Sequence, residues 1–229
     1  MKALSRNGVD QRQGGADLAD AGPAVGSGGP DEFTSDALGL GPRAQRTREL
    51  ILDTSRDLFI SQGYAATRIA HITAACGISR AGFYTYFRDK REVFNAIGHA
   101  AYTAVLDVTG KWERLPRPAA YADIEQWARD YFTMMDAHGP IVFFSQQAVP
   151  DDETFRASRT RMELRVAWTF GARLQSRQRT PSSSPDALGV ATLAMLDRSW
   201  YMARKARLPI ADADLISTAA QYIAAILAA

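Results

Sequence analysis

The stretch from Thr67 to Phe87 limits what this chain can fold into more than any other, because its pattern predicts two short helices joined by a tight turn. Ile69, Ile72 and Ala75 recur every third residue, which places one apolar stripe along the first helix. Gly77 follows where a left-handed, helix-ending residue is needed, and glycine adopts that conformation without steric cost. These features predict a helix-turn-helix whose second helix enters the major groove of DNA.

The two predicted helices also have recognisable N-caps. Thr67 and Ser79 each carry a hydroxyl that can accept from a backbone N–H otherwise left without a partner. The second helix is expected to run from Arg80 to about Phe87, with Phe83 and Phe87 both directed to the core because they lie one helical turn apart. The opposite face then carries Arg80, Ala81, Tyr84 and Thr85.

The same region carries a family resemblance, through the run T-x4-I-T-x2-C-G-I-S-x-A-x-F-Y-x-Y-F-x2-K-x2-V-F. It resembles the signature of the TetR (tetracycline-repressor-like) family of bacterial transcriptional regulators, and the match extends over about a quarter of the chain, from Arg43 to Phe94. Gly82 departs from the pattern, because Ser, Thr or Pro is common there, and it leaves one recognition-helix position without a side chain. The resemblance implies about nine helices and a C-terminal domain that binds a small molecule and dimerises.

The formal net charge of +2 is distributed unevenly along the chain. Residues 1–42 hold three basic and six acidic side chains, whereas residues 43–91 hold nine basic and four acidic ones. Residues 92–229 hold fifteen of each sign. A basic segment that coincides with a helix-turn-helix is the electrostatic footprint of a DNA-binding module.

These patterns divide the chain into three predicted parts. Residues 1–42 are rich in Gly, Ala, Asp, Ser and Pro without periodicity, which predicts a disordered extension. Residues 43–91 form the DNA-binding domain, and residues 92–229 form the ligand-binding and dimerisation domain. The expected class is all-α, with a long fourth helix from about Lys90 to Thr109 joining the two domains. Further helices are expected at about 121–137, 140–148, 152–178, 185–206 and 212–228, since no credible strand pattern occurs.

The expected DNA contacts are of two kinds. Arg80 is the candidate for reading a guanine edge, because a guanidinium can pair with it through two hydrogen bonds, and Thr85 could touch a thymine methyl group. The remaining candidates are expected to bind phosphates, and the resemblance implies backbone contacts at the positions of Thr67, Ser79, Tyr84, Tyr86 and Lys90. The full candidate set is Arg43, Arg46, Thr67, Arg68, Ser79, Arg80, Ala81, Tyr84, Thr85, Tyr86 and Lys90.

The C-terminal part has aromatic and methionine residues at helical spacing, which either fill a core or line an apolar cavity. The resemblance favours a cavity, and because these stripes contain few charges, the expected effector is an apolar or aromatic small molecule. The candidate lining residues are Trp127, Tyr131, Met134, Phe143, Phe144, Trp168, Met195 and Trp200.

The last helix is apolar nearly all round and dense in alanine, so it needs burial on more than one side. Together with the helix at 185–206 it predicts a homodimer whose subunits contribute two helices each. A twofold dimer reads a palindromic operator.

Catalysis has little support in this sequence. The three histidines lack metal-ligand spacing, and no phosphate loop, dinucleotide fingerprint or nucleophile elbow occurs, so we expect neither a metal nor a cofactor. The single cysteine and the lack of a signal-peptide or membrane-spanning apolar run predict a cytoplasmic protein. Two alternatives to a ligand-responsive repressor stay open: an effector-independent architectural DNA-binding dimer, and an enzyme with a helix-turn-helix appendage.

Overall fold

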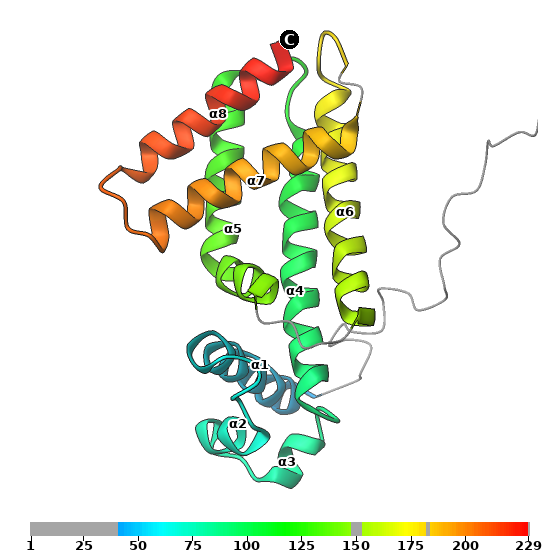
Figure 1. The fold of residues 1–229 in the computed structure, drawn as a ribbon, viewed down its shortest axis with the longest axis vertical. Helices are drawn as coiled ribbons and strands as arrows, with labels where there is room; N and C mark the ends of the chain where they lie inside the picture. The colour runs from blue at the N-terminus through cyan, green and yellow to red at the C-terminus, as the bar shows by residue number, and fades with distance from the viewer. Residues whose placement is uncertain (1–40, 148–152, 182–183, 229) are drawn as a thin grey trace, which may run out of the picture. The chain divides into compact units, whose positions relative to one another are not determined.

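The computed structural model describes residues 41–147, 153–181 and 184–228, and within these ranges the chain is helical without any strand (Figure 1). The predicted all-α class is confirmed. The predicted disordered extension lies outside the described residues, except for its last two positions. The elements are α1 (Pro42–Gln62), α2 (Ile69–Cys76), α3 (Arg80–Tyr84), α4 (Lys90–Gly110), the 3-10 helix η3 (Lys111–Arg114), α5 (Tyr121–Gln147), α6 (Glu153–Gln175), α7 (Pro185–Arg204) and α8 (Asp212–Ala228).

The described residues form eight α-helices rather than about nine, because α5 continues through Pro140, where the sequence predicted a break. Proline inside a helix lacks the N–H that would bond the previous turn. Packing on both sides of Pro140 offsets that loss. The Trp200 ring lies so close to Gly139 that a Cβ there would come within 2.6 Å of it, and Phe143 stacks on Trp200 with ring centroids 5.9 Å apart.

The first core lies among α1, α2, α3 and the beginning of α4. Phe59 and Phe94 meet at its centre with their rings edge to face, 5.6 Å apart, and Tyr64 lies against both. Ile141 of α5 is also buried in this core, so α5 reaches it as well as α4 does. Its buried members are Ile51, Phe59, Ile72, Phe83, Phe87, Val93, Phe94, Ala96, Ile97, Ala101 and Ile141.

The second core is built from α5, α7 and α8 together with the end of α4, η3 and α6. Large rings dominate it: Trp127 stacks on Phe170 at 5.1 Å, and Trp112 meets both edge to face. Its buried members are Val108, Trp112, Ile124, Trp127, Ala128, Tyr131, Phe132, Met135, Phe170, Leu174, Leu196, Trp200, Ile216, Ala219, Ala220 and Ile223.

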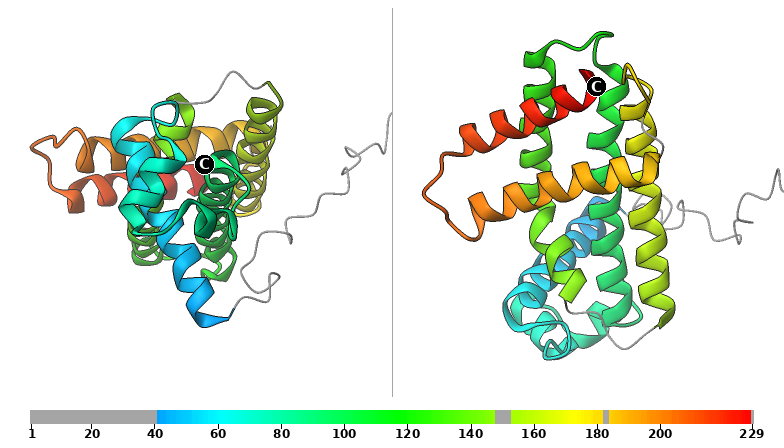
Figure 2. Two further views of the ribbon diagram at one scale, coloured as in Figure 1. Left: turned by 90° about the horizontal axis from the view of Figure 1, so that it is seen from below. Right: turned by 45° about the horizontal axis from the view of Figure 1, so that its top comes forward.

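Helices α6 and α7 cross in direct backbone contact. A Cβ on Gly171 would lie 1.8 Å from the carbonyl oxygen of Pro185, and a Cβ on Gly189 would lie 1.8 Å from that of Ala167. No real side chain fits at such distances, so the absence of both side chains allows this crossing. Figure 2 shows α7 crossing α6 in a second orientation.

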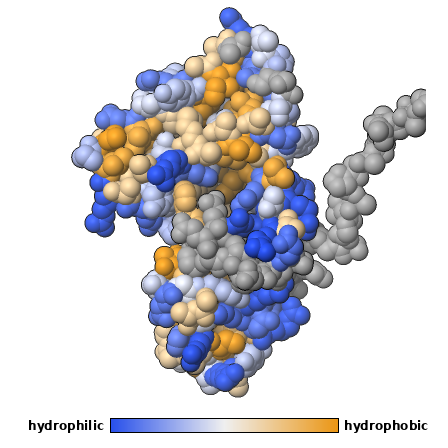
Figure 3. All heavy atoms as spheres, viewed as in Figure 1, coloured by the Kyte–Doolittle hydropathy of each residue, from blue (hydrophilic) through white to orange (hydrophobic). Residues whose placement is uncertain are grey.

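Apolar side chains cover much of the outer surface of α7 and α8 in Figure 3, and exposed Arg198 interrupts them on α7. On α7, exposed Ala187, Val190, Ala191 and Ala194 follow one helical stripe, and on α8 Tyr222 is 59% exposed next to a row of small residues. None of the helices in the described part of the chain is both long and apolar enough to cross a membrane.

Candidate nucleic-acid interface and effector domain

The turn between α2 and α3 has the geometry that the sequence predicts. Gly77 adopts the left-handed conformation with φ 65° and ψ 30°, which ends α2. Ser79 caps α3, where its Oγ accepts from the backbone N–H of Gly82 at 3.0 Å. The recognition helix is shorter than expected, since α3 ends at Tyr84, yet Phe83 and Phe87 are both buried as predicted.

The outward face of α3 carries the four predicted side chains, and all of them are exposed: Arg80, Ala81, Tyr84 and Thr85. Arg80 and Tyr84 lie one turn apart, and a guanidinium nitrogen of Arg80 donates to the Tyr84 hydroxyl at 3.3 Å. That bond uses only one of the five guanidinium N–H donors, so the others remain available to a base edge or a phosphate. Arg80 and Tyr84 therefore present donors from one face.

The prediction that Thr67 is the N-cap of the following helix is wrong, and its predicted DNA contact stays a prediction. The residue is fully buried, and its hydroxyl donates back to the carbonyl oxygens of Gly63 at 2.8 Å and Leu58 at 3.3 Å. The N-cap of α2 is Arg68, one residue later. A threonine in this sequence context fits either role, and only the packing of α1 against α2 decides between them.

The other phosphate candidates are accessible to different degrees. Arg43 and Arg46 are exposed in the first turns of α1, and Arg68 is exposed at the start of α2. Tyr86 is half-buried and packs against the first core. Arg48, which belongs to the same basic run, is buried instead, with its guanidinium 5.1 Å from the centre of the Phe87 ring.

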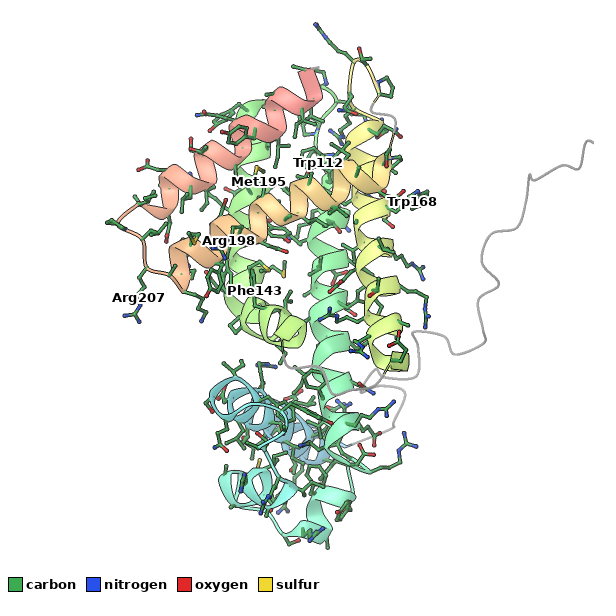
Figure 4. The ribbon with its side chains drawn as sticks, in the orientation of Figure 1. Trp112, Phe143, Trp168, Met195, Arg198 and Arg207 are labelled. Atoms are coloured by element: carbon green, nitrogen blue, oxygen red, sulfur yellow. The ribbon has the colours of Figure 1, made fainter. Side chains whose placement is uncertain are left out.

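The candidate effector residues divide into three groups. Trp127, Tyr131 and Trp200 are fully buried in the second core, and the indole N–H of Trp127 donates to the Val108 carbonyl at 2.9 Å. Met134, Phe143 and Met195 are half-buried against that core, and the Phe144 side chain lies outside the described residues. Trp168 is 54% exposed, and Figure 4 shows it projecting outward from α6, so it does not line an internal cavity as predicted.

Comparison with known proteins identifies the N-terminal region. Residues 51–97 match the family described as "Bacterial regulatory proteins, tetR family". The HTH-type transcriptional regulator AcrR of Shigella flexneri is 41% identical over 54 residues, which cover 24% of this chain and 25% of that protein. The family match covers 47 of the 229 residues. The chain aligns with about a quarter of the length of AcrR.

Solved structures extend the likeness in fold to most of the chain. A transcriptional regulator from Aquifex aeolicus VF5 has a TM-score of 0.62 at 18% identity and covers 79% of this chain and 99% of its own. AibR, solved in complex with isovaleryl coenzyme A and operator DNA, has a TM-score of 0.57 at 15% identity, covering 77% of this chain and 97% of its own. At these identities the likeness establishes the fold.

Lys90 ties the beginning of α4 to the turn between α1 and α2. Its Nζ donates to the carbonyl oxygens of Tyr64 at 2.6 Å and Thr67 at 2.7 Å, and it lies 4.2 Å from the centre of the Tyr64 ring. Burial lowers the pKa of Lys90. Two of the three ammonium donors are therefore committed to the turn between α1 and α2, and only the third can face a phosphate.

We expect Lys90→Met to destabilise the protein by about 1–2 kcal/mol, because two charge-assisted hydrogen bonds to backbone carbonyls are lost and both acceptors are left without this donor. Urea unfolding followed by circular dichroism measures the change. Arg46→Met is the matched control, since Arg46 is exposed on α1, and it should leave stability unchanged. Equal stability of the two variants would mean that Lys90 acts on DNA alone.

Asp197 is a polar residue of the second core that the sequence analysis did not single out. Its carboxylate on α7 accepts from the Tyr131 hydroxyl of α5 at 2.7 Å. Burial, and to a smaller extent Glu163, raises the pKa of Asp197 to about 6, although the hydrogen bond from Tyr131 acts in the opposite direction. The sequence around Asp197 could not predict this hydrogen bond, because its partner Tyr131 lies on another helix.

The raised pKa of Asp197 means that the folded state binds its proton more tightly than the unfolded chain does. The protonated carboxyl group of Asp197 therefore stabilises the folded state. This contribution is fully present below about pH 3.9, the pKa of an aspartate in the unfolded chain, and it is lost as the pH rises through about 6. Asp197→Asn should therefore stabilise the protein by about 1–3 kcal/mol at pH 7.5 and have little effect at pH 4.5. Urea denaturation at the two pH values measures the difference.

Asp136 provides a control, because its pKa is shifted in the opposite direction to that of Asp197. Burial alone would raise its pKa, but hydrogen bonds from Arg204 and from the Trp200 indole, both at 2.8 Å, hold the pKa below the ordinary value. Asp136→Asn should therefore lose stability at neutral pH, where the paired charge contributes. If the stability of Asp197→Asn depended on pH in the same way as that of Asp136→Asn, the conclusion that burial disfavours the ionised carboxylate of Asp197 would be wrong.

Proposed function

We propose that this TetR-family chain is a ligand-responsive transcriptional repressor that acts in the cytoplasm as a homodimer bound to a palindromic operator. The observation that carries the proposal is the outward face of α3, where exposed Arg80 and Tyr84 stand together on a domain with nine basic and four acidic side chains. Phosphate contacts from the basic residues would position the domain, and α3 would read base edges.

The outer surface of α7 and α8 supports the homodimer. Its stripe of Ala187, Val190, Ala191 and Ala194 is exposed and made of small residues, which let a partner helix approach closely. An apolar surface of this kind on a chain that is otherwise well charged is typical of a protein interface. Two copies related by a twofold axis would present two α3 helices to successive major grooves.

The second core supports an effector that is apolar and contains an aromatic ring. Trp127, Phe170 and Trp112 form a continuous cluster of stacked and edge-to-face rings, which would offer similar contacts to a planar ligand that entered between them. The structure of AibR with an acyl-coenzyme A and operator DNA supports the broader idea that this fold can hold a ligand and DNA.

Residues 139–143 of α5 would carry the response from one domain to the other. Gly139 and Phe143 contact Trp200 of α7, whereas Ile141 between them is buried in the core of the DNA-binding domain. A shift of α7 relative to α5 would thus reach that core directly, in addition to any movement of α4. The effector weakens DNA binding only as far as it binds the two states with different affinity.

The decisive experiment titrates a set of apolar aromatic compounds against the protein with and without its operator, the operator being selected from a random duplex library at low salt. A compound that releases operator must bind more weakly to the DNA-bound dimer, by the same factor. It should also raise the melting temperature of the free protein. If every compound that binds does so equally in both states, the ligand-responsive mechanism fails.

An effector-independent architectural dimer is the second candidate. The observation in its favour is that Trp127, Tyr131 and Trp200, all proposed to line a cavity, are fully buried against other core side chains. The same titration separates the two functions, because an architectural protein would bind operator with an affinity that none of the compounds changes.

A further inference from the structure

A groove of about 480 Å³ lies on the outside of the second domain, away from both the DNA-binding face and the internal core. Its floor is one side of α6, where Thr169, Ala172 and Ser176 are small. Trp168 and Arg173 of α6, together with Glu113 of η3 and Arg117 of the following loop, complete the lining. The volume falls within the range of small-molecule sites.

The walls of the groove are fixed before any ligand arrives. Arg173 donates from Nε to the Glu113 carboxylate at 2.7 Å, which ties η3 to α6. Arg177, one turn beyond Arg173, donates to the carbonyl oxygens of Trp112, Leu115 and Pro116 at 2.7–2.9 Å and so holds the next loop against the same helix. A ligand would meet walls that are already ordered, which reduces the entropic cost of binding.

The groove carries more positive than negative charge. Arg117 and Arg173 line it together with a single carboxylate, Glu113, and Arg117 is exposed without an ion-pair partner among the described residues. The hydrogen bond and the charge of Arg173 lower the pKa of Glu113, and the charge of Arg117 contributes to a smaller extent. An anion would pair with the exposed donors of Arg117 and relieve the repulsion between the guanidinium groups of Arg117 and Arg173.

Trp168 adds an aromatic surface at the edge of this positive site. Its ring is 54% exposed, whereas the other three tryptophans of the chain are fully buried (Figure 4). An exposed indole beside guanidinium groups suits a planar ring that carries a negative charge, because the ring can stack on the indole while the anion pairs with arginine.

We infer that the groove between Trp168, Arg117 and Arg173 is a second small-molecule site, separate from the proposed effector core, which binds aromatic carboxylates. The indole of Trp168 stacks with the aromatic ring. The guanidinium of Arg117 pairs with the carboxylate.

The probe is 1-naphthoate, titrated into the full-length protein at low salt by isothermal titration calorimetry. Trp168→Ala and Arg117→Gln should each weaken its binding about tenfold, in the range expected for loss of a stacking contact or a charged hydrogen bond. Arg161→Gln is the matched control, since Arg161 is exposed on α6 outside the groove, and it should leave the affinity unchanged. Trp168 and Arg117 are both exposed, so circular dichroism should show intact variants.

Two further ligands separate the contributions of ring and charge. One is 1-naphthylmethanol, which keeps the aromatic ring but has no charge. The other is cyclohexanecarboxylate, which keeps the charge but has no aromatic ring. Each should bind about tenfold more weakly than 1-naphthoate. The inference is wrong if 1-naphthoate does not bind, or if Trp168→Ala binds it as tightly as the natural protein. It is also wrong if Trp168→Ala dissociates the dimer in sedimentation experiments, because Trp168 would then be a subunit contact. Operator affinity is measured separately, so failure here leaves the proposed repressor function untouched.

Discussion

Affinity for a selected operator should fall by about three to five powers of ten between 50 and 200 mM salt, the range for proteins that neutralise about six to ten phosphates. The expectation follows from the basic residues exposed around the recognition helix, among them Arg43, Arg46, Arg68 and Arg80. Each phosphate contact releases condensed counterions, and a twofold dimer doubles the number of contacts. Fluorescence anisotropy with a labelled duplex over a series of salt concentrations gives the slope.

Variants distinguish base recognition from phosphate binding within this interface. Arg80→Ala should cost about 1–3 kcal/mol on the preferred sequence and little on random duplex, so that sequence preference is relaxed. Arg46→Ala should weaken all sequences alike and make the salt slope shallower by about one for each subunit. Arg161→Gln on α6 should change neither property. A salt-independent affinity, or equal losses from Arg80→Ala on every sequence, would contradict the assignment of α3 to base reading.

The helix-turn-helix was predictable because local chemistry determines it. Gly77 has to adopt a positive φ, Ser79 has to cap a helix, and Phe83 and Phe87 have to face the same way, whatever the rest of the chain does. The limits of α4 were predictable for the same reason, since Asp89 accepts from the Glu92 backbone N–H at 2.8 Å and so marks where the helix begins.

Apart from the early end of α3, the differences from the predictions concern residues whose roles depend on another helix. Thr67 carries a hydroxyl of the type that caps a helix, but α1 offers it backbone carbonyls instead. The two carbonyls that bind Lys90 were not predicted either, because they belong to the α1–α2 turn. The continuity of α5 through Pro140 depends on Trp200, some sixty residues later in the chain. Trp168 is apolar and helical in sequence, and only the packing of α6 shows that its face is the outer one. Periodicity assigns a residue to a face, but it does not say what covers that face.

The same dependence on tertiary contact predicts a large loss of stability at the crossing of α6 and α7. Gly189→Ala should destabilise the protein by about 3 kcal/mol, at the upper end of the range for overpacked sites, because the new methyl group would lie 1.8 Å from the Ala167 carbonyl oxygen. Backbone on both sides of the contact cannot move aside as a flexible side chain would. The helices must separate, and the close packing that positions Phe170 and Leu196 in the second core is lost with them.

Gly171→Ala should have an effect of similar size, since its methyl group would lie 1.8 Å from the Pro185 carbonyl oxygen. Gly98→Ala on α4 is the control, because nothing lies within 4 Å of the added Cβ and alanine favours a helix interior over glycine by about 0.5–1 kcal/mol. Thermal unfolding followed by circular dichroism should therefore show melting temperatures lowered by about 6–12 °C for the first two variants and slightly raised for the third. If Gly189→Ala melted like the natural protein, α6 and α7 could not cross in backbone contact. In that case the position of the α7 surface proposed for dimerisation would have to be reconsidered.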